Sequence, residues 1–256
     1  MAMMADLASQ IWNARKNGGH VAVSEIDAIG SRAAAYAIQA AGAKASELTR
    51  AGWKVAATSG LAQELLGMEG PSIGPVFAEL IHEPGDKLEA RPEQGTAVEC
   101  EFAFVMGRNL GSSQEITRAD VVAAIERAHI AIEVVGCRFE GGFKGVGSHL
   151  CISDFLFNVA FVPGPEIANW QDVDLKAVMA KLLLNGDVAN QGVGADVLGD
   201  PVEALCWAAN EANGIGLPFR KGDVITTGTM TGATLVNPGD QVIGDFGDLG
   251  QVALSF

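Results

Sequence analysis

The sequence contains few cysteines, and none of the four belongs to a C-x-x-C pair. This argues against a thiolate zinc site and against a disulfide framework, and it indicates the reducing cytosol. There is also no N-x-[ST] sequon and no G-x-G-x-x-G fingerprint. The chain therefore lacks both a glycosylation acceptor and the dinucleotide-binding motif.

Long apolar runs are missing as well. The longest strongly apolar stretch without a charge, 155–165, is too short to span a bilayer. The first ten residues carry an acid at position 6 and no basic start, so we expect no signal peptide. Together these features predict a cytoplasmic protein without a membrane partner.

Basic residues are scarce relative to acidic ones. Lys and Arg number 17 and Asp and Glu number 31, so the formal net charge is −14. A chain this acidic repels phosphate backbones, which argues against nucleic-acid binding. Hydrophobic residues at 48% with only 19% charged residues rule out a disordered chain. This composition is typical of a well-buried core, with further surface hidden in a homo-oligomer.

The apolar spacing divides the chain into a helical first part, residues 1–72, and a β-rich part, residues 73–256. Asn185-Gly186 between two strand patterns predicts a type I′ hairpin. Helices are predicted up to Gly18-Gly19 and over 31–50, 61–67, 118–128 and 201–212. Strands are predicted over 53–58, 97–105, 130–138, 156–162, 177–184, 187–190, 224–227 and 241–246.

Two carboxylates interrupt the predicted strand 97–105. Because side chains alternate along a strand, Val98, Cys100 and Phe102 share one apolar face, whereas Glu99 and Glu101 share the other. Like charges at this spacing repel unless a cation lies between them or water surrounds them. The pattern fits either a metal site or the solvated face of a half-buried strand.

Glu133 favours the metal site, because it is the one charge in the apolar segment 130–135. A buried carboxylate must be paired, protonated or bound to a metal. With Glu99 and Glu101 it would form an all-oxygen site, which suits Mg²⁺ or Mn²⁺ better than zinc.

Other polar residues in apolar surroundings are candidates for binding and catalysis. Lys54 fits a strand-end lysine, a cationic partner for a carboxylate substrate, or a desolvated acid/base with a lowered pKa. Arg138 fits a clamp behind Glu133 or a plain ion pair, and Asp154 fits a catalytic carboxylate or a turn cap. Thr229, one of four threonines around Gly228, offers a hydroxyl to an anion or to an ordinary turn.

Several of these motifs, taken in chain order, resemble the fumarylacetoacetate hydrolase superfamily. The likeness begins at about Ile26 and continues to the C-terminus. Within the superfamily, the sequence is similar to 2-keto-4-pentenoate (2-hydroxypenta-2,4-dienoate) hydratases and 4-oxalocrotonate decarboxylases. The matching segments are Tyr36-Ala37-Ile38-Gln39, Gly52-Trp53-Lys54, Glu99-x-Glu101, Ile132-Glu133-Val134-Val135 and Lys221-Gly222-Asp223.

The resemblance implies an α+β fold, with a mixed β-sheet roll or barrel around the metal site and a helical N-terminal part that contributes a lid. It implies that Glu99, Glu101 and Glu133 bind Mg²⁺ or Mn²⁺, and that Lys54 is the active-site lysine. The expected substrate is a small 2-oxo acid from aromatic-compound catabolism, chelated through its carboxylate and carbonyl oxygens.

The sequence departs from its relatives around the expected pocket. Ser72 stands where they carry an acid, and Gly136 and Cys137 precede Arg138 where they carry Asp-Ser. Phe155 and Phe157 replace small polar residues. If strand alternation holds, both phenyl groups point the same way, either into the core or into a pocket that then favours an apolar tail over a second carboxylate.

The resemblance implies a hydro-lyase that adds water to a 2-hydroxy-2,4-dienoate to give a 4-hydroxy-2-oxo acid. The alternatives are a decarboxylase of a 2-oxo-3-enedioate, an acylpyruvate C–C hydrolase with His82 or His20 as base, and a degenerate partner subunit without activity. Pairing with a homologous hydratase or decarboxylase subunit is a further expectation.

Overall fold

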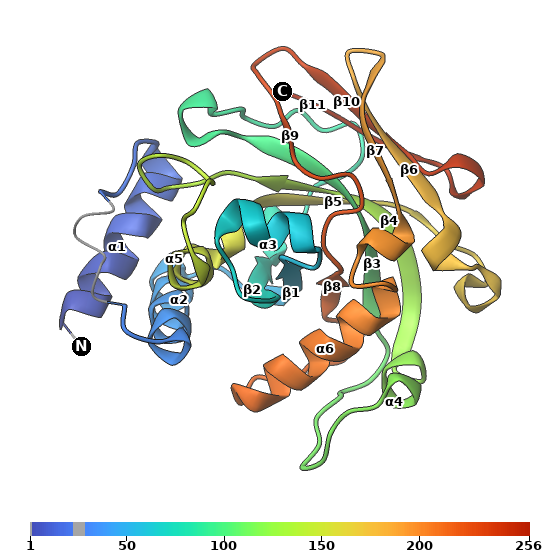
Figure 1. The fold of residues 1–256 in the computed structure, drawn as a ribbon, viewed down its shortest axis with the longest axis horizontal. Helices are drawn as coiled ribbons and strands as arrows, with labels where there is room; N and C mark the ends of the chain where they lie inside the picture. Colours follow the sequence, from blue (N-terminus) through green and yellow to red (C-terminus); the bar gives the residue numbers. More distant parts are fainter. Residues whose placement is uncertain (1, 23–28) are drawn as a thin grey trace.

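The computed structural model describes residues 2–22 and 29–256, so the start of the family likeness at Ile26 lies outside the described residues. Two β-sheets form the body of the protein, and helices flank the larger one (Figure 1). The α+β prediction is confirmed. The helices are α1 (Ala2–Asn17), α2 (Arg32–Ser46), α3 (Gly60–Leu66), α4 (Arg118–Val122), α5 (Ser148–Ser153) and α6 (Pro201–Gly214). The strands are β1 (Arg50–Ala56), β2 (Ser72–Phe77), β3 (Ala97–Met106), β4 (Ile125–Val135), β5 (Asn158–Glu166), β6 (Met179–Leu184), β7 (Asp187–Val193), β8 (Val224–Thr226), β9 (Thr234–Leu235), β10 (Gln241–Asp245) and β11 (Gln251–Ser255).

The larger sheet has the strand order β2-β1-β8-β3-β4-β5, and β9 pairs with β3. Strands β1 and β8 form a parallel pair, where Gly52 lies opposite Val224. A Cβ atom on Gly52 would lie 1.8 Å from the Val224 carbonyl oxygen, so only glycine allows these two strands to approach. This contact holds β1, with Lys54, beside the centre of the sheet.

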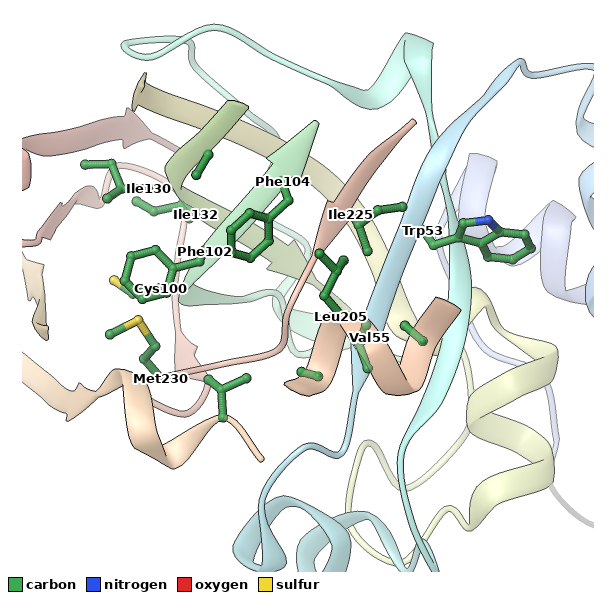
Figure 2. Close-up of a cluster of buried hydrophobic side chains, with 14 of the residues drawn as sticks. Trp53, Val55, Cys100, Phe102, Phe104, Ile130, Ile132, Leu205, Ile225 and Met230 are labelled. Atoms are coloured by element: carbon green, nitrogen blue, oxygen red, sulfur yellow. The ribbon is translucent and has the colours of Figure 1, made fainter. Parts of the chain in front are cut away.

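The core lies on the apolar face of β3 and β4. Phe102 and Phe104 of β3 are fully buried, as is Ile130 of β4. Figure 2 shows Leu205 of α6 beside Ile225 and Val55, so the helix covers the same sheet. The alternation predicted for β3 therefore holds, and its charged residues lie on the opposite face.

The smaller sheet has the order β11-β10-β6-β7. Asn185 and Gly186 join β6 to β7 with positive φ angles of 54° and 93°. Both φ values match a type I′ turn, so the predicted hairpin is confirmed. Gly244 of this sheet faces Cys100 and Ile132, which brings the smaller sheet onto the core face of the larger one.

Several predicted element boundaries are wrong. Helix α2 ends at Ser46, and the backbone has entered β1 by Arg50. The helix predicted over 118–128 is only the short α4, because the residues from Ile125 onward pair with β3 as the start of β4. Long-range strand pairing overrides local helix preference there.

The strand predictions need two further corrections. Arg138 lies outside β4, which ends at Val135. The strand predicted from 156 begins only at Asn158, after a 3₁₀ turn over Phe155–Phe157. Among the described residues, no helix combines the length and apolarity needed to cross a membrane.

Candidate functional site

Three glutamates converge on the polar face of β3 and β4. Glu99 and Glu133 lie directly opposite each other in the antiparallel pair, and Glu101 follows two residues after Glu99 on the same face. One carboxylate oxygen from each lies within 4.8 Å of the others. Glu101 and Glu133 are fully buried, and Glu99 is half-buried.

Lys54 reaches this group from β1. Its ammonium nitrogen Nζ lies 2.8 Å from Oε2 of Glu133, and it donates a hydrogen bond of 2.9 Å to the carbonyl oxygen of Leu156. Both charged side chains are almost completely shielded from water. Lys54 therefore lies directly beside the carboxylates.

Backbone and side-chain donors hold two of the carboxylates in place. The backbone N–H of Gly228 donates to Oε2 of Glu101 at 3.0 Å, and the Asn158 amide donates to Oε1 of Glu133 at 2.9 Å. Within the described residues, Oε1 of Glu101 is buried and has no hydrogen-bond partner. An unpaired buried carboxylate oxygen is costly, so this atom is available as a ligand.

Burial and mutual repulsion shift the pKa values of this group. Desolvation raises the pKa of Glu99 to about 7, although the Lys54 charge opposes the shift. Desolvation and the charges of Glu133 and Glu99 raise the pKa of Glu101 well above its usual range. For Lys54, desolvation lowers the pKa, but Glu133 and the other two carboxylates outweigh it and the net shift is upward. Lys54 is therefore a cation at neutral pH.

The donor set fits a hard divalent cation. Three carboxylates supply only oxygen ligands, and one of their buried oxygens lacks any partner. When all three are ionised, the carboxylates carry three negative charges against a single lysine, an excess that raises their pKa values here and that a divalent ion would neutralise. The convergence of the three side chains that a shared metal site requires is present.

A cavity of about 670 Å³ opens from the polar face of the sheet. Lys54, Glu99 and Glu101 lie at one end, and Thr229 with the neighbouring turn lies on one wall. Apolar side chains make up most of the remaining surface; they include Leu61, Leu65, Leu66, Met68, Phe143, Leu156, Phe157 and Leu235. The cavity thus has a charged head and an apolar outer part.

Arg138 and Asp154 lie outside the lining of this cavity. Both side chains are fully buried, and Arg138 Nε donates to Asp154 Oδ1 at 2.7 Å. Arg138 also donates through its backbone N–H to Asp154 Oδ2 at 3.1 Å. Desolvation raises the pKa of Asp154, while the Arg138 charge opposes the shift. The two residues that were candidates for substrate binding and catalysis are each other's partners.

Ser72 is also fully buried and does not line the cavity. It pairs with Ala56 in the ladder between β1 and β2, and its hydroxyl has no hydrogen-bond partner among the described residues. Ala56 lies two residues after Lys54 on β1, so their side chains share one side of the sheet. As the partner of Ala56, Ser72 lies on that same side.

Phe155 and Phe157 do not share one direction, so the expectation from strand alternation is wrong. They belong to a turn in which Phe155, Leu156 and Phe157 all have positive φ angles, of 53°, 50° and 65°. Phe155 packs edge-on against Trp12 and Phe77, away from the cavity. Phe157 lines the cavity and packs against Phe143.

Sequence reasoning missed the groups that hold the charged head. The carbonyl of Leu156 and the N–H of Gly228 are backbone groups, so no side-chain pattern could reveal them. Asn158 could have been found, because it is the one amide in the apolar stretch 155–165. The leucines of α3 line the cavity but were not among the predicted site residues.

Comparison with known proteins adds a family match and close relatives. The family model described as fumarylacetoacetate (FAA) hydrolase C-terminal matches residues 68–255. The chain is 30% identical to a 2-keto-4-pentenoate hydratase of Burkholderia vietnamiensis, over 99% of this chain and 97% of that protein. It is 31% identical to the TodF product hydratase of Pseudomonas putida, over 87% of this chain and 83% of that protein.

The solved structures include one that is similar over the whole chain. This is the 4-oxalocrotonate decarboxylase from Pseudomonas putida G7 complexed with magnesium and adipate, with a TM-score of 0.89 and 27% identity, covering 100% of this chain and 97% of that one. Maleylpyruvate hydrolase from Sphingobium sp. SYK-6, complexed with manganese and pyruvate, has a TM-score of 0.56 and 20% identity, so it shares only the fold.

Proposed function

This chain belongs to the fumarylacetoacetate hydrolase family, and from that premise we propose that it is a metal-dependent hydratase of a 2-hydroxy-2,4-dienoate. The product is a 4-hydroxy-2-oxo acid. Relatives named 2-keto-4-pentenoate hydratase support this activity along nearly the full length of the chain. The observation that carries the proposal is the convergence of three glutamates, Glu99, Glu101 and Glu133, with Lys54. Lys54, Glu99 and Glu101 also line one cavity.

Glu99, Glu101 and Glu133 would hold Mg²⁺ or Mn²⁺. When bound, such an ion supplies Lewis-acid polarisation to the carboxylate and carbonyl oxygens of a 2-oxo acid. The similar decarboxylase structure is a magnesium complex, which supports this choice of ion.

Two proton movements define the reaction. The proton of the 2-hydroxyl group leaves and a proton is added at C5, which gives a 2-oxo-3-enoate. Water then adds across the remaining double bond, with OH at C4 and H at C3. Lys54 is placed to donate a proton in these steps, because its Nζ lies at the head of the cavity and its raised pKa keeps it protonated.

The remaining groups of the site orient Lys54 and the substrate, and they shield the reacting atoms from water. The Leu156 carbonyl and Glu133 fix the Nζ atom of Lys54 between them, so its proton points in a defined direction. The Thr229 hydroxyl, on the cavity wall, is an available partner for a substrate oxygen. The apolar outer wall excludes bulk water from the reacting atoms, which strengthens the electrostatic interactions there.

A second candidate is decarboxylation of a 2-oxo-3-enedioate. It is favoured by the high structural similarity to the 4-oxalocrotonate decarboxylase, whose complex contains adipate, a dicarboxylate. Acylpyruvate cleavage has less support, since the histidines considered as its base do not line the cavity. His82 lies 3.4 Å from Asp86, and His20 contacts the Glu93 carbonyl. A degenerate subunit is disfavoured by the complete carboxylate and lysine set.

We further propose that the protein acts in the cytoplasm as a homo-oligomer, with a homologous decarboxylase or hydratase subunit as an additional candidate partner. The acidic, apolar-rich composition supports assembly through hidden apolar surface.

The test is an absorbance assay with Mg²⁺, Mn²⁺ or EDTA. A 2-hydroxydienoate, a 2-oxo-3-enedioate and an acylpyruvate are each incubated with the protein, and products are identified by mass. We expect metal-dependent loss of the dienoate with a mass gain of one water. Release of CO₂ from the enedioate as the faster reaction would assign the decarboxylase instead.

A further inference from the structure

We propose that the outer part of the cavity is a subsite for a long apolar tail on the substrate. This inference rests on the proposed function for the acid-binding head, and it names the substrate class: a monocarboxylic 2-oxo acid with an extended alkyl or aryl tail.

The size and lining of the cavity carry the inference. At about 670 Å³ it falls in the range of roughly 300–1,000 Å³ that encloses drug-sized ligands, which is far more than a five-carbon acid requires. The charged head accounts for only one end. Beyond it the walls are formed by side chains of α3, by Phe143 and Phe157, and by Leu235 of β9.

The mouth of the cavity exposes apolar side chains that lack cover. Leu65 is 50% exposed, Leu61 78% and Leu235 63%, and all three line the cavity. Three large exposed hydrophobic residues at one opening form a patch that favours an apolar occupant. Because the patch is continuous with the acid-binding head, a single molecule bound at the head would reach it.

Charge at the mouth disfavours a second carboxylate. The outer lining has one cation, Lys144, and one anion, Asp196, so their charges offset each other. Lys144 is exposed, and water already solvates it. A distal carboxylate would lie among leucine and phenylalanine side chains and would lose hydration there.

Equilibrium binding tests the subsite without turnover. The Mg²⁺-loaded protein is titrated calorimetrically with 2-oxopentanoate, 2-oxooctanoate and 2-oxooctanedioate. We expect the affinity to rise about fourfold for each added methylene, and the dicarboxylate to bind at least tenfold more weakly than 2-oxooctanoate. Equal affinity for the two monocarboxylates, or preference for the dicarboxylate, would overturn the proposal.

A matched pair of variants locates the effect. Leu65→Asp places a charge on the cavity wall at a half-exposed position, and Leu217→Asp makes the same change at an exposed leucine outside the cavity. Only Leu65→Asp should abolish the increase in affinity with tail length. If both variants lose this increase equally, the assignment of the outer cavity as the tail subsite is contradicted. Hydration of 2-hydroxypenta-2,4-dienoate is measured in parallel. If no hydration is detected but binding still depends on tail length, the proposed hydratase activity is refuted while the apolar subsite is supported.

A different observation supports a second inference: the geometry points to Arg138 and Asp154 as positioning residues for the charged head. Three consecutive residues without a glycine, Phe155, Leu156 and Phe157, adopt left-handed backbone conformations. Each such residue costs free energy, so the surrounding structure must hold the turn in place.

The buried ion pair supplies that support. Arg138 bonds the Asp154 carboxylate through its side chain and its backbone N–H, and it donates a further bond to the Asp154 carbonyl at 3.1 Å. The backbone N–H of Phe157 donates to the same carbonyl at 2.8 Å. The pair therefore holds the turn at its first residue.

The turn delivers two contacts to the site. The Leu156 carbonyl receives the Lys54 ammonium, and Asn158, directly after the turn, donates to Glu133. A shift of the turn would move both contacts at once. Arg138 and Asp154 thus act on the carboxylates through Leu156 and Asn158, without touching the cavity.

The experiment replaces the pair without leaving a lone buried charge. Arg138→Met with Asp154→Leu is compared with Arg118→Met, which removes an exposed cation far from the turn. Mn²⁺ affinity is measured by electron paramagnetic resonance, and circular dichroism checks the fold. We expect a dissociation constant about 10- to 100-fold higher in the double variant and no change in the control.

The variant Asn158→Ala tests independently whether the turn positions Glu133. It leaves the ion pair intact and removes the contact with Glu133, so it should weaken Mn²⁺ binding on its own. Combined with the double variant, the losses should be less than additive, because both act along one path. Wild-type Mn²⁺ affinity in a folded double variant, or fully additive losses, would overturn the positioning role.

Discussion

Lys54 and Glu133 form an ion pair that is almost completely shielded from water, with Nζ 2.8 Å from Oε2. The pair joins β1 to β4 although β8 and β3 lie between these strands in the sheet. Among the described residues, no other cation forms an ion pair with Glu99 or Glu101. The site is therefore built with more negative charge than the protein itself neutralises, which is the condition that favours a divalent ion.

Removing a carboxylate should abolish metal binding while the fold persists. Glu133→Gln keeps the shape and the hydrogen bond to Asn158 but loses one negative charge. We expect at least about 100-fold weaker Mn²⁺ binding and no metal-dependent turnover, with an unchanged circular dichroism spectrum. The measurement is calorimetric titration with Mn²⁺. Retained affinity would show that the three glutamates are not the ligands.

Removing Lys54 should affect both stability and turnover. Lys54→Met leaves Glu133 as a buried charge without its partner, so the metal-free protein should lose about 3–5 kcal/mol in urea unfolding. Added Mg²⁺ should restore part of this stability, because the ion takes over the neutralisation. Full turnover in Lys54→Met would refute the role in proton movement.

The stability of the metal-free protein should fall as the pH rises. Free Glu99 titrates near its ordinary pKa of 4.5, whereas in the folded protein its pKa is about 7. Between these values the folded state holds a proton that the unfolded chain has released, so the free energy of unfolding decreases with pH. Thermal melts in EDTA at pH 5 and pH 7.5 check this, and Glu99→Gln should flatten the dependence. A melting temperature that rises over this range would contradict it.

The close approach of β1 and β8 should make Gly52 irreplaceable. Gly52→Ala would force its Cβ into the Val224 carbonyl, which requires the strands to separate. We expect a loss of more than about 3 kcal/mol in unfolding free energy, or insoluble protein. Gly60→Ala, at the start of α3 where a Cβ meets nothing within 4 Å, is the control. Equal stability of the two variants would argue against the parallel pair.

Three of the four thiols should be unreactive in the native state. Burial raises the pKa of Cys100 and of Cys137 to about 12 and that of Cys151 above its usual range, so thiolate is scarce at pH 8. Labelling with Ellman's reagent should modify only the half-buried Cys206, and slowly, because burial raises its pKa too. In denaturant all four should react. Fast labelling of more than one native thiol would mean that the core opens readily.

Local sequence determined the features that depend on periodicity and on short motifs. Alternation along β3 separated Cys100 and Phe102 from the glutamates on the opposite face, and the structure keeps that division. Asn185-Gly186 encoded its turn because both residues tolerate positive φ. The proximity of Lys54 to the carboxylates was also predicted, from the motif resemblance and from a charge placed in an apolar run.

Tertiary structure alone decided what surrounds the charged head. The segment 118–128 reads as a helix, yet its second half pairs with β3, because a ladder with a long apolar strand outweighs local preference. The left-handed turn at Phe155–Phe157 violates strand alternation, and the buried pair that Asp154 forms with the distant Arg138 holds it in place. The apolar wall likewise combines side chains from α3, Phe143 and Leu235, which are far apart in sequence. Strand periodicity is a local property, whereas the partner of a buried charge and the lining of a cavity depend on which segments the fold brings together.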